Sequence, residues 1–150
     1  MPNSSSHMIV GSEEWCSFPT MGVPAIKARV DSGAKTSSIH AFNLQPFRRG
    51  GTSWVSFEVH PLQHNRQIVV RCELPVSDRR SVKSSSGVSE KRYVVRVPLN
   101  IGNEIWDIEL TLANRDSMGY RMLLGREAMS GRMLVHPPPN HCLGLLPATE

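Results

Sequence analysis

Hydrophobic and polar positions alternate along much of the chain, and this pattern predicts short β-strands. Residues 54–60 show it best, because Val55, Phe57 and Val59 fall on one side of an extended chain and the positions between them are mainly polar. Four other segments are rich in valine, isoleucine and aromatic residues and are further strand candidates: 25–30, 67–74, 93–99 and 105–112.

Glycine and asparagine mark the turns between these strands. The Asn-Ile-Gly-Asn stretch at 100–103 predicts a hairpin, since Gly and Asn tolerate positive φ, and Gly50-Gly51 predicts another turn. Only residues 126–130 favour a helix, with Gly131 as its stop. Many short strands with one short C-terminal helix indicate an all-β domain, either a small barrel or a sandwich.

Residues 76–92 differ from the rest of the chain. They hold six serines, five basic and two acidic residues, and show no hydrophobic period. We expect a long exposed loop, which is either functional or a flexible insertion.

Composition changes this picture only modestly. The 150 residues, 39% apolar and 20% charged, are typical of one globular domain, and no apolar run is long enough for a membrane helix. The net charge is +4, but the basic residues are scattered, so we expect no nucleic-acid partner. Three widely spaced cysteines argue against a disulfide framework. With no visible signal peptide, they favour the cytoplasm; residues 1–8 are interpreted as a disordered or tag-derived start.

The sharpest chemical signal is Asp31-Ser32-Gly33, where a strand ends in a carboxylate. The glycine lets the backbone come close, so that its N–H can hydrogen-bond the carboxylate, and the serine hydroxyl can bond a neighbouring backbone group. Taken alone, this tripeptide usually marks an ordinary turn.

A second signal is Met122-Leu123-Leu124-Gly125-Arg126, which runs directly into the short helix. An apolar-apolar-Gly-Arg element downstream of a D-[ST]-G strand resembles the pairing found in retropepsin-like aspartic proteases. The resemblance implies a closed retropepsin-like barrel spanning residues 9–150 as one domain. It also implies that Asp31, Ser32 and Gly33 form the catalytic motif, supported by Ala34, Leu123, Leu124, Gly125 and Arg126.

Residues 22–41, 110–116 and 122–126 together look like one bacterial family. That family has carried the label ATP-dependent zinc protease, and its members are associated with an ATP-grasp glutamate ligase that modifies a ribosomal protein. The resemblance therefore implies a peptide or protein substrate and a place beside ribosomal-protein modification.

The residues do not support the ATP and zinc of that label. Gly33-Ala34-Lys35-Thr36 only imitates the end of a phosphate-binding loop, and no H-E-x-x-H string is present. The prolines 137–139 hold His136 apart from His141 and Cys142, whereas His60 and His64 are a weaker metal candidate at helical spacing. We expect no cofactor and no metal.

Aspartic proteolysis requires two carboxylates that share a proton, but the chain has one D-S-G strand. We therefore predict a homodimer with an Asp31/Asp31′ dyad across a two-fold axis. Lys35 stands where retroviral enzymes carry an acid that pairs with the arginine, so Arg126 needs another partner, for which Asp116 is a candidate.

Two other functions stay open: a non-catalytic peptide-binding module on the same fold, and a metal-dependent protease. Retropepsins also close a flap over the substrate. Strand order predicts flap arms at 67–74 and 93–99 with residues 76–92 as the tip, and Gly50-Gly51 is the competing tip.

Overall fold

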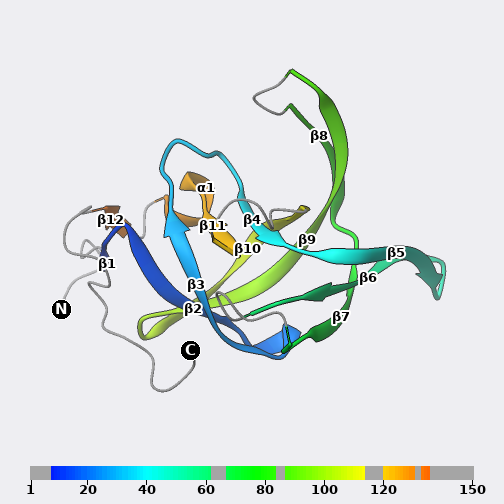
Figure 1. The fold of residues 1–150 in the computed structure, drawn as a ribbon, viewed down its shortest axis with the longest axis horizontal. Coiled ribbons are helices and arrows are strands. Elements are labelled where there is room, and N and C mark those ends of the chain that lie inside the picture. The colour runs from blue at the N-terminus through cyan, green and yellow to red at the C-terminus, as the bar shows by residue number, and fades with distance from the viewer. Residues whose placement is uncertain (1–7, 62–66, 84–86, 114–119, 131–132, 136–150) are drawn as a thin grey trace.

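The computed structural model describes residues 8–61, 67–83, 87–113, 120–130 and 133–135. Strands dominate these ranges, with one α-helix and one 3-10 helix (Figure 1). In chain order the elements are β1 (Met8–Val10), β2 (Glu13–Phe18), η1 (Pro19–Met21), β3 (Val23–Val30), β4 (Ser37–His40), β5 (Phe42–Arg49), β6 (Thr52–Val59), β7 (Val70–Pro75), β8 (Asp78–Lys83), β9 (Ser89–Ile101), β10 (Glu104–Ala113), β11 (Met122–Leu124), α1 (Arg126–Met129) and β12 (Met133–Val135).

Six of the described strands close into a barrel. Their order is β10–β4–β11–β3–β2–β9, and β9 pairs back onto β10. β9 and β10 form the predicted hairpin, with Ile101 opposite Glu104 and Gly102 at φ 60°. The expectation of an all-β closed barrel with one short C-terminal helix is confirmed.

Alternation along the strands fills the barrel with apolar side chains. On β10, for example, Ile108, Leu110 and Leu112 are all buried. Each such side chain contributes roughly 1.5–3 kcal/mol when it leaves water. The largest apolar side chains that are fully buried among the described residues are Phe18, Ile26, Ile39, Phe57, Leu99, Ile101, Leu110, Leu112, Met122 and Leu124.

Strands β5, β6 and β7 form a separate three-stranded sheet that extends from the barrel as an arm (Figure 1). The predicted turn at Gly50-Gly51 joins β5 to β6, with both glycines at positive φ. On β6, Val55, Phe57 and Val59 are buried as predicted, so the base of this arm shares the barrel core.

The prediction of a long loop at 76–92 is largely wrong, because much of this segment forms a hairpin. β8 pairs antiparallel with the first half of β9, from Asp78 opposite Val94 to Lys83 opposite Ser89, and the resulting hairpin projects beyond the barrel (Figure 1). Its residues are mostly exposed or half-buried, so it needs no apolar face, and the hydrophobic pattern therefore gave no signal.

The pairing of the predicted flap arms is also wrong. β7 pairs with β6 and begins at Val70 rather than at 67, while β9 pairs with β8. The helix ends at Met129 with Ser130 as its C-cap, one residue earlier than expected. Among the described residues, no helix is long and apolar enough to cross a membrane.

Candidate active site

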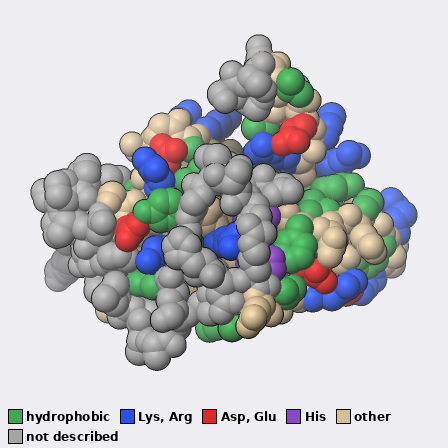
Figure 2. All heavy atoms as spheres, in the orientation of Figure 1, with side chains coloured by type: hydrophobic (Ala, Val, Ile, Leu, Met, Phe, Trp, Pro, Cys, Tyr) green, Lys and Arg blue, Asp and Glu red, His purple; other side chains and the backbone are tan. Residues whose placement is uncertain are grey.

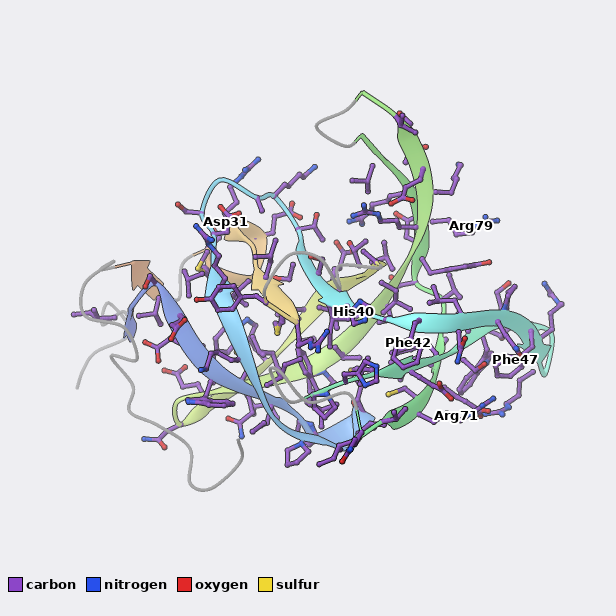
Figure 3. All side chains as sticks on the ribbon, viewed as in Figure 1. Asp31, His40, Phe42, Phe47, Arg71 and Arg79 are labelled. Atoms are coloured by element: carbon purple, nitrogen blue, oxygen red, sulfur yellow. The ribbon has the colours of Figure 1, made fainter. Side chains whose placement is uncertain are left out.

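The two segments singled out by the sequence meet in the barrel wall. β11 inserts between β3 and β4, parallel to β3 and antiparallel to β4, and places Leu124 opposite Val30. The backbone N–H of Asp31 then donates to the Leu124 carbonyl at 3.0 Å. The aspartate therefore follows a strand whose Ala28 and Arg29 are paired with β2 on one side and β11 on the other (Figure 3).

Gly33 orients the Asp31 carboxylate. Its backbone N–H donates to Asp31 Oδ1 at 3.0 Å, as expected, and the Ala34 N–H donates to the Asp31 carbonyl at 3.1 Å. A Cβ on Gly33 would lie 3.2 Å from the same carboxylate oxygen, which explains the glycine. Asp31 is half-buried, whereas Ser32 is exposed and its hydroxyl makes no hydrogen bond with another described residue.

Gly125 packs against the far end of the aspartate loop. A Cβ at this position would lie 2.6 Å from the Thr36 carbonyl carbon and 2.9 Å from the Ser37 nitrogen. The Gly125 N–H donates to the buried Ser37 hydroxyl at 2.9 Å. The glycine of the apolar-apolar-Gly element is therefore required by close backbone packing, since no side chain fits there.

Arg126 ties the start of α1 to the same loop. Its guanidinium donates to the Gly33 carbonyl at 3.2 Å, and its backbone N–H donates to the Ala34 carbonyl at 2.8 Å. The Glu127 N–H likewise donates to the Lys35 carbonyl at 3.1 Å. Retroviral enzymes carry an acidic partner for this arginine at the position of Lys35, whereas here Arg126 donates to loop carbonyl oxygens. Asp116, the partner that the sequence suggested for Arg126, lies outside the described residues.

An open groove of about 440 Å³ begins beside this loop. Its floor includes Ala34, Lys35 and Leu123, and its far wall is the β8–β9 hairpin, through Arg80, Val82 and Arg92 among others. Asp31 itself is not among the lining residues.

The hairpin wall carries a small network of charges. Arg80 donates to both oxygens of Glu109 on β10 at 2.9 Å and to Asp78 at 2.7 Å. These hydrogen bonds raise the pKa of Arg80, and the bond from Arg80 is the main cause of a lowered pKa at Asp78. The Arg80–Glu109 ion pair, in which Nη2 contacts both carboxylate oxygens, fastens the hairpin to the barrel.

Sequence reasoning missed Ser37, Arg80 and Glu109. The spacing of Asp78 and Arg80 was a usable signal, since residues two apart share one face of a strand. Ser37 carries no such signal, because its role depends on a glycine far away in the sequence.

The metal candidates gain no support from the residues described. His60 stacks on Phe42 with ring centroids 4.5 Å apart, and its Nδ1 lies 3.4 Å from the Ile68 carbonyl oxygen. The described part of the chain contains no group of three or more metal-ligating side chains. His64, His136, His141 and Cys142 lie outside it.

A closed barrel whose D-S-G loop is clamped by an apolar-apolar-Gly strand defines the retropepsin-like class of folds. Residues 9–142 match the family model described as "RimB-like: Retropepsin-like aspartic endopeptidase RimB", and the chain belongs to this RimB-like family.

Similar proteins with curated names are named as ligases, whereas the family model is named as an endopeptidase. Proteins named "Probable alpha-L-glutamate ligase" from Shewanella pealeana and Desulfotalea psychrophila are 64% and 62% identical, over 94% and 96% of this chain. A protein of the same name from Parasynechococcus marenigrum is 64% identical over 91% of the chain. The chain spans only 31%, 31% and 29% of these relatives, so their name describes much longer proteins.

A solved structure shares the fold. The crystal structure of a Legionella pneumophila protein of unknown function (DUF785) superposes with a TM-score of 0.76 at 24% identity, covering 92% of this chain and 99% of that one.

Proposed function

We propose that this chain is an aspartic endopeptidase of retropepsin type, with a dyad formed by Asp31 of two copies. The observation that carries the proposal is the Asp31 loop: its carboxylate is oriented by the Gly33 N–H and its backbone is clamped by Leu124. Asp31 is half-buried, so part of the residue stays accessible to a second copy.

In such a dyad, the nearness of two carboxylates keeps one protonated while the other is ionised. The ionised group takes a proton from water, which attacks the scissile carbonyl carbon, and the protonated group donates to the carbonyl oxygen. The C–N bond then breaks as the carboxyl group that took the water proton passes it to the leaving amine, while the other carboxylate takes back the proton of the hydroxyl group that becomes the new carbonyl. Among the described residues, no carboxyl group of the same chain is hydrogen-bonded to Asp31, and the proposal takes the second acid from a partner copy.

The β8–β9 hairpin is our candidate for the flap. It borders the groove through Arg80, Val82 and Arg92, whereas the Gly50-Gly51 turn is not among the groove's lining residues. This assignment keeps β9, which contains the predicted arm 93–99, and replaces the predicted arm 67–74 by β8, which lies within the predicted tip 76–92.

We further propose that the substrate is acidic and is the product of glutamate ligation. Lys35, Arg80 and Arg92 line the groove, and Lys35 makes no ion pair with another described residue. In a relative named as a probable glutamate ligase, this domain matches about a third of a longer chain, and that association supports a role beside such chemistry.

The test compares Asp31→Asn with Asp107→Asn on a glutamate-containing peptide, followed by mass spectrometry. Asp107 is a matched exposed carboxylate on β10 that does not line the groove. We expect Asp31→Asn to lose hydrolysis, since an amide cannot exchange the shared proton, and Asp107→Asn to retain it.

Dilution supplies the second test. Hydrolysis per chain should fall as sedimentation shows the dimer dissociating, because one copy carries half of the dyad. Equal rates for Asp31→Asn and the parent, or constant activity in a demonstrated monomer, contradict the mechanism. Binding without cleavage favours the peptide-binding module, and loss on chelation with recovery on zinc favours the metalloprotease.

A further inference from the structure

A second pocket, of about 250 Å³, lies between the hairpin base and the β5–β6 arm. Phe47, Trp54 and Tyr93 line it together with Arg48 and Arg79. In Figure 3, Arg79 and Phe47 lie on the side of the molecule away from Asp31.

Strand alternation gives the hairpin two different basic faces. Arg79 is opposite Tyr93 in the β8–β9 ladder and both line this pocket, whereas the next pair, Arg80 and Arg92, lines the groove. The hairpin therefore separates the pocket from the groove.

The aromatic rings hold the arginine side chains in place. Arg79 lines the pocket, and its guanidinium carbon lies 5.0 Å from the Tyr93 ring centre. The guanidinium carbon of Arg49, which is not among the lining residues, lies 4.4 Å from the Trp54 ring centre and 5.2 Å from that of Phe47. Stacked guanidinium groups keep their N–H edges available for an oxygen ligand.

The charge of the pocket is unbalanced. No carboxylate lines it, and the two acids nearby are engaged: Glu73 with Arg49 at 2.8 Å and Asp78 with Arg80 at 2.7 Å. Arg48 bonds only neutral groups in the described chain, and Arg79 makes no ion pair with another described residue. Basic side chains also gather around the end of the arm in Figure 2.

We propose that this pocket is a docking site for a protein segment that presents a carboxylate beside an apolar side chain. The pocket is smaller than a typical small-ligand cavity, so it suits one anchoring side chain. Arginine with tryptophan, tyrosine and phenylalanine is the composition of protein interface centres.

Single-stranded nucleic acid fits less well. Binding of bases requires open ring faces, and each of the three rings already carries a guanidinium on one face. The docking site does not depend on hydrolysis at Asp31, so its test is independent of the proposed activity.

The test is made on the full chain carrying Asp31→Asn, so that no probe is cut. Fluorescence anisotropy follows a labelled peptide, Gly-Ser-Leu-Asp-Phe-Asp-Leu-Ser-Gly, its Asn-for-Asp counterpart and a uridine octamer. We expect the acidic peptide to bind and the Asn peptide to bind at least about tenfold more weakly, because its charge-assisted hydrogen bonds are lost.

Variants locate the site. Arg79→Gln and Trp54→Phe should each weaken the acidic peptide, the former about tenfold. Arg71→Gln is the matched control, since Arg71 is an exposed arginine on β7 outside the pocket and should leave binding unchanged. Circular dichroism checks that each variant is folded.

Four results would overturn the proposal. The acidic peptide could bind Arg79→Gln as tightly as the parent, or Arg71→Gln could weaken it as much as Arg79→Gln does. Weaker binding with Lys35→Gln instead of Arg79→Gln would mean that the peptide lies in the groove, and binding of the uridine octamer without the peptide would mean that the ligand is a nucleic acid. A change in sedimentation with Arg79→Gln, without a change in peptide affinity, would mean that a second copy occupies the pocket.

Discussion

Replacing Gly125 by alanine tests whether the aspartate loop depends on close backbone packing. The added Cβ would lie 2.6 Å from the Thr36 carbonyl carbon, and 2.9 Å from both the Thr36 oxygen and the Ser37 nitrogen. All three are backbone atoms, so no flexible side chain can move away to make room. The loop 31–36 or β11 has to shift instead.

The expected cost follows from two contributions. Overpacking a well-filled site costs about 1–3 kcal/mol. A shift that breaks the bond from the Gly125 N–H to the Ser37 hydroxyl leaves a buried donor unpaired, which costs about 1–3 kcal/mol more. We therefore expect Gly125→Ala to lower the free energy of unfolding by about 2–6 kcal/mol.

Equilibrium unfolding in urea measures this change, with Gly50→Ala as the control. Gly50 has φ +59° and no atom within 4 Å of the added Cβ, so its substitution carries only backbone strain of about 1–2 kcal/mol. If Gly125→Ala does not fold, Ser37→Ala provides the smaller perturbation, since it removes only the hydrogen bond.

Amide exchange at Asp31 and Ala34 shows where the damage lies. Both N–H groups are bonded within the clamped loop, so their protection should fall more than that of β9. A Gly125→Ala protein as stable as the Gly50→Ala protein, with unchanged protection at Asp31, would refute the packing argument.

Three further outcomes follow from the charges and thiols. Arg80→Gln should speed amide exchange in the β8–β9 hairpin by about fivefold, for a partly exposed pair worth roughly 1 kcal/mol; unchanged exchange would mean that Glu109 does not fasten the hairpin. The hydrogen bond from Arg80 lowers the pKa of Asp78, so the stability that this ion pair contributes should be fully present above the usual aspartate pKa of about 3.9. It should be lost as the pH falls through the lower pKa of the folded protein, and NMR titration of the hairpin amides can follow this loss. Burial raises the pKa of Cys16 to about 12 and of Cys72 to about 11, so iodoacetamide at pH 8 should label neither thiol in the folded protein and both in urea, as read by mass spectrometry; rapid labelling of the folded protein would contradict their burial.

Local sequence determined much of this protein. The alternation at 54–60, the hairpin at 100–103 and the turn at Gly50-Gly51 all have the predicted structure, because period-2 patterning and positive φ depend on near neighbours. The bond from Gly33 to the Asp31 carboxylate is equally local, spanning two residues. Asp31 was named as the candidate reactive group because this motif, together with the element at 122–126, resembles retropepsin-like proteases.

Tertiary structure decided the rest. Closure of the barrel and the insertion of β11 between β3 and β4 join segments that are far apart in the chain, and Gly125 owes its role to contact with Thr36. The β8–β9 hairpin escaped prediction because a ribbon with two largely exposed faces carries no hydrophobic period. Neighbouring residues of β8 lie on opposite faces of the hairpin, so Arg80 lines the groove and Arg79 lines the second pocket. Which cavity each face borders depends on the elements packed beside it in the folded protein.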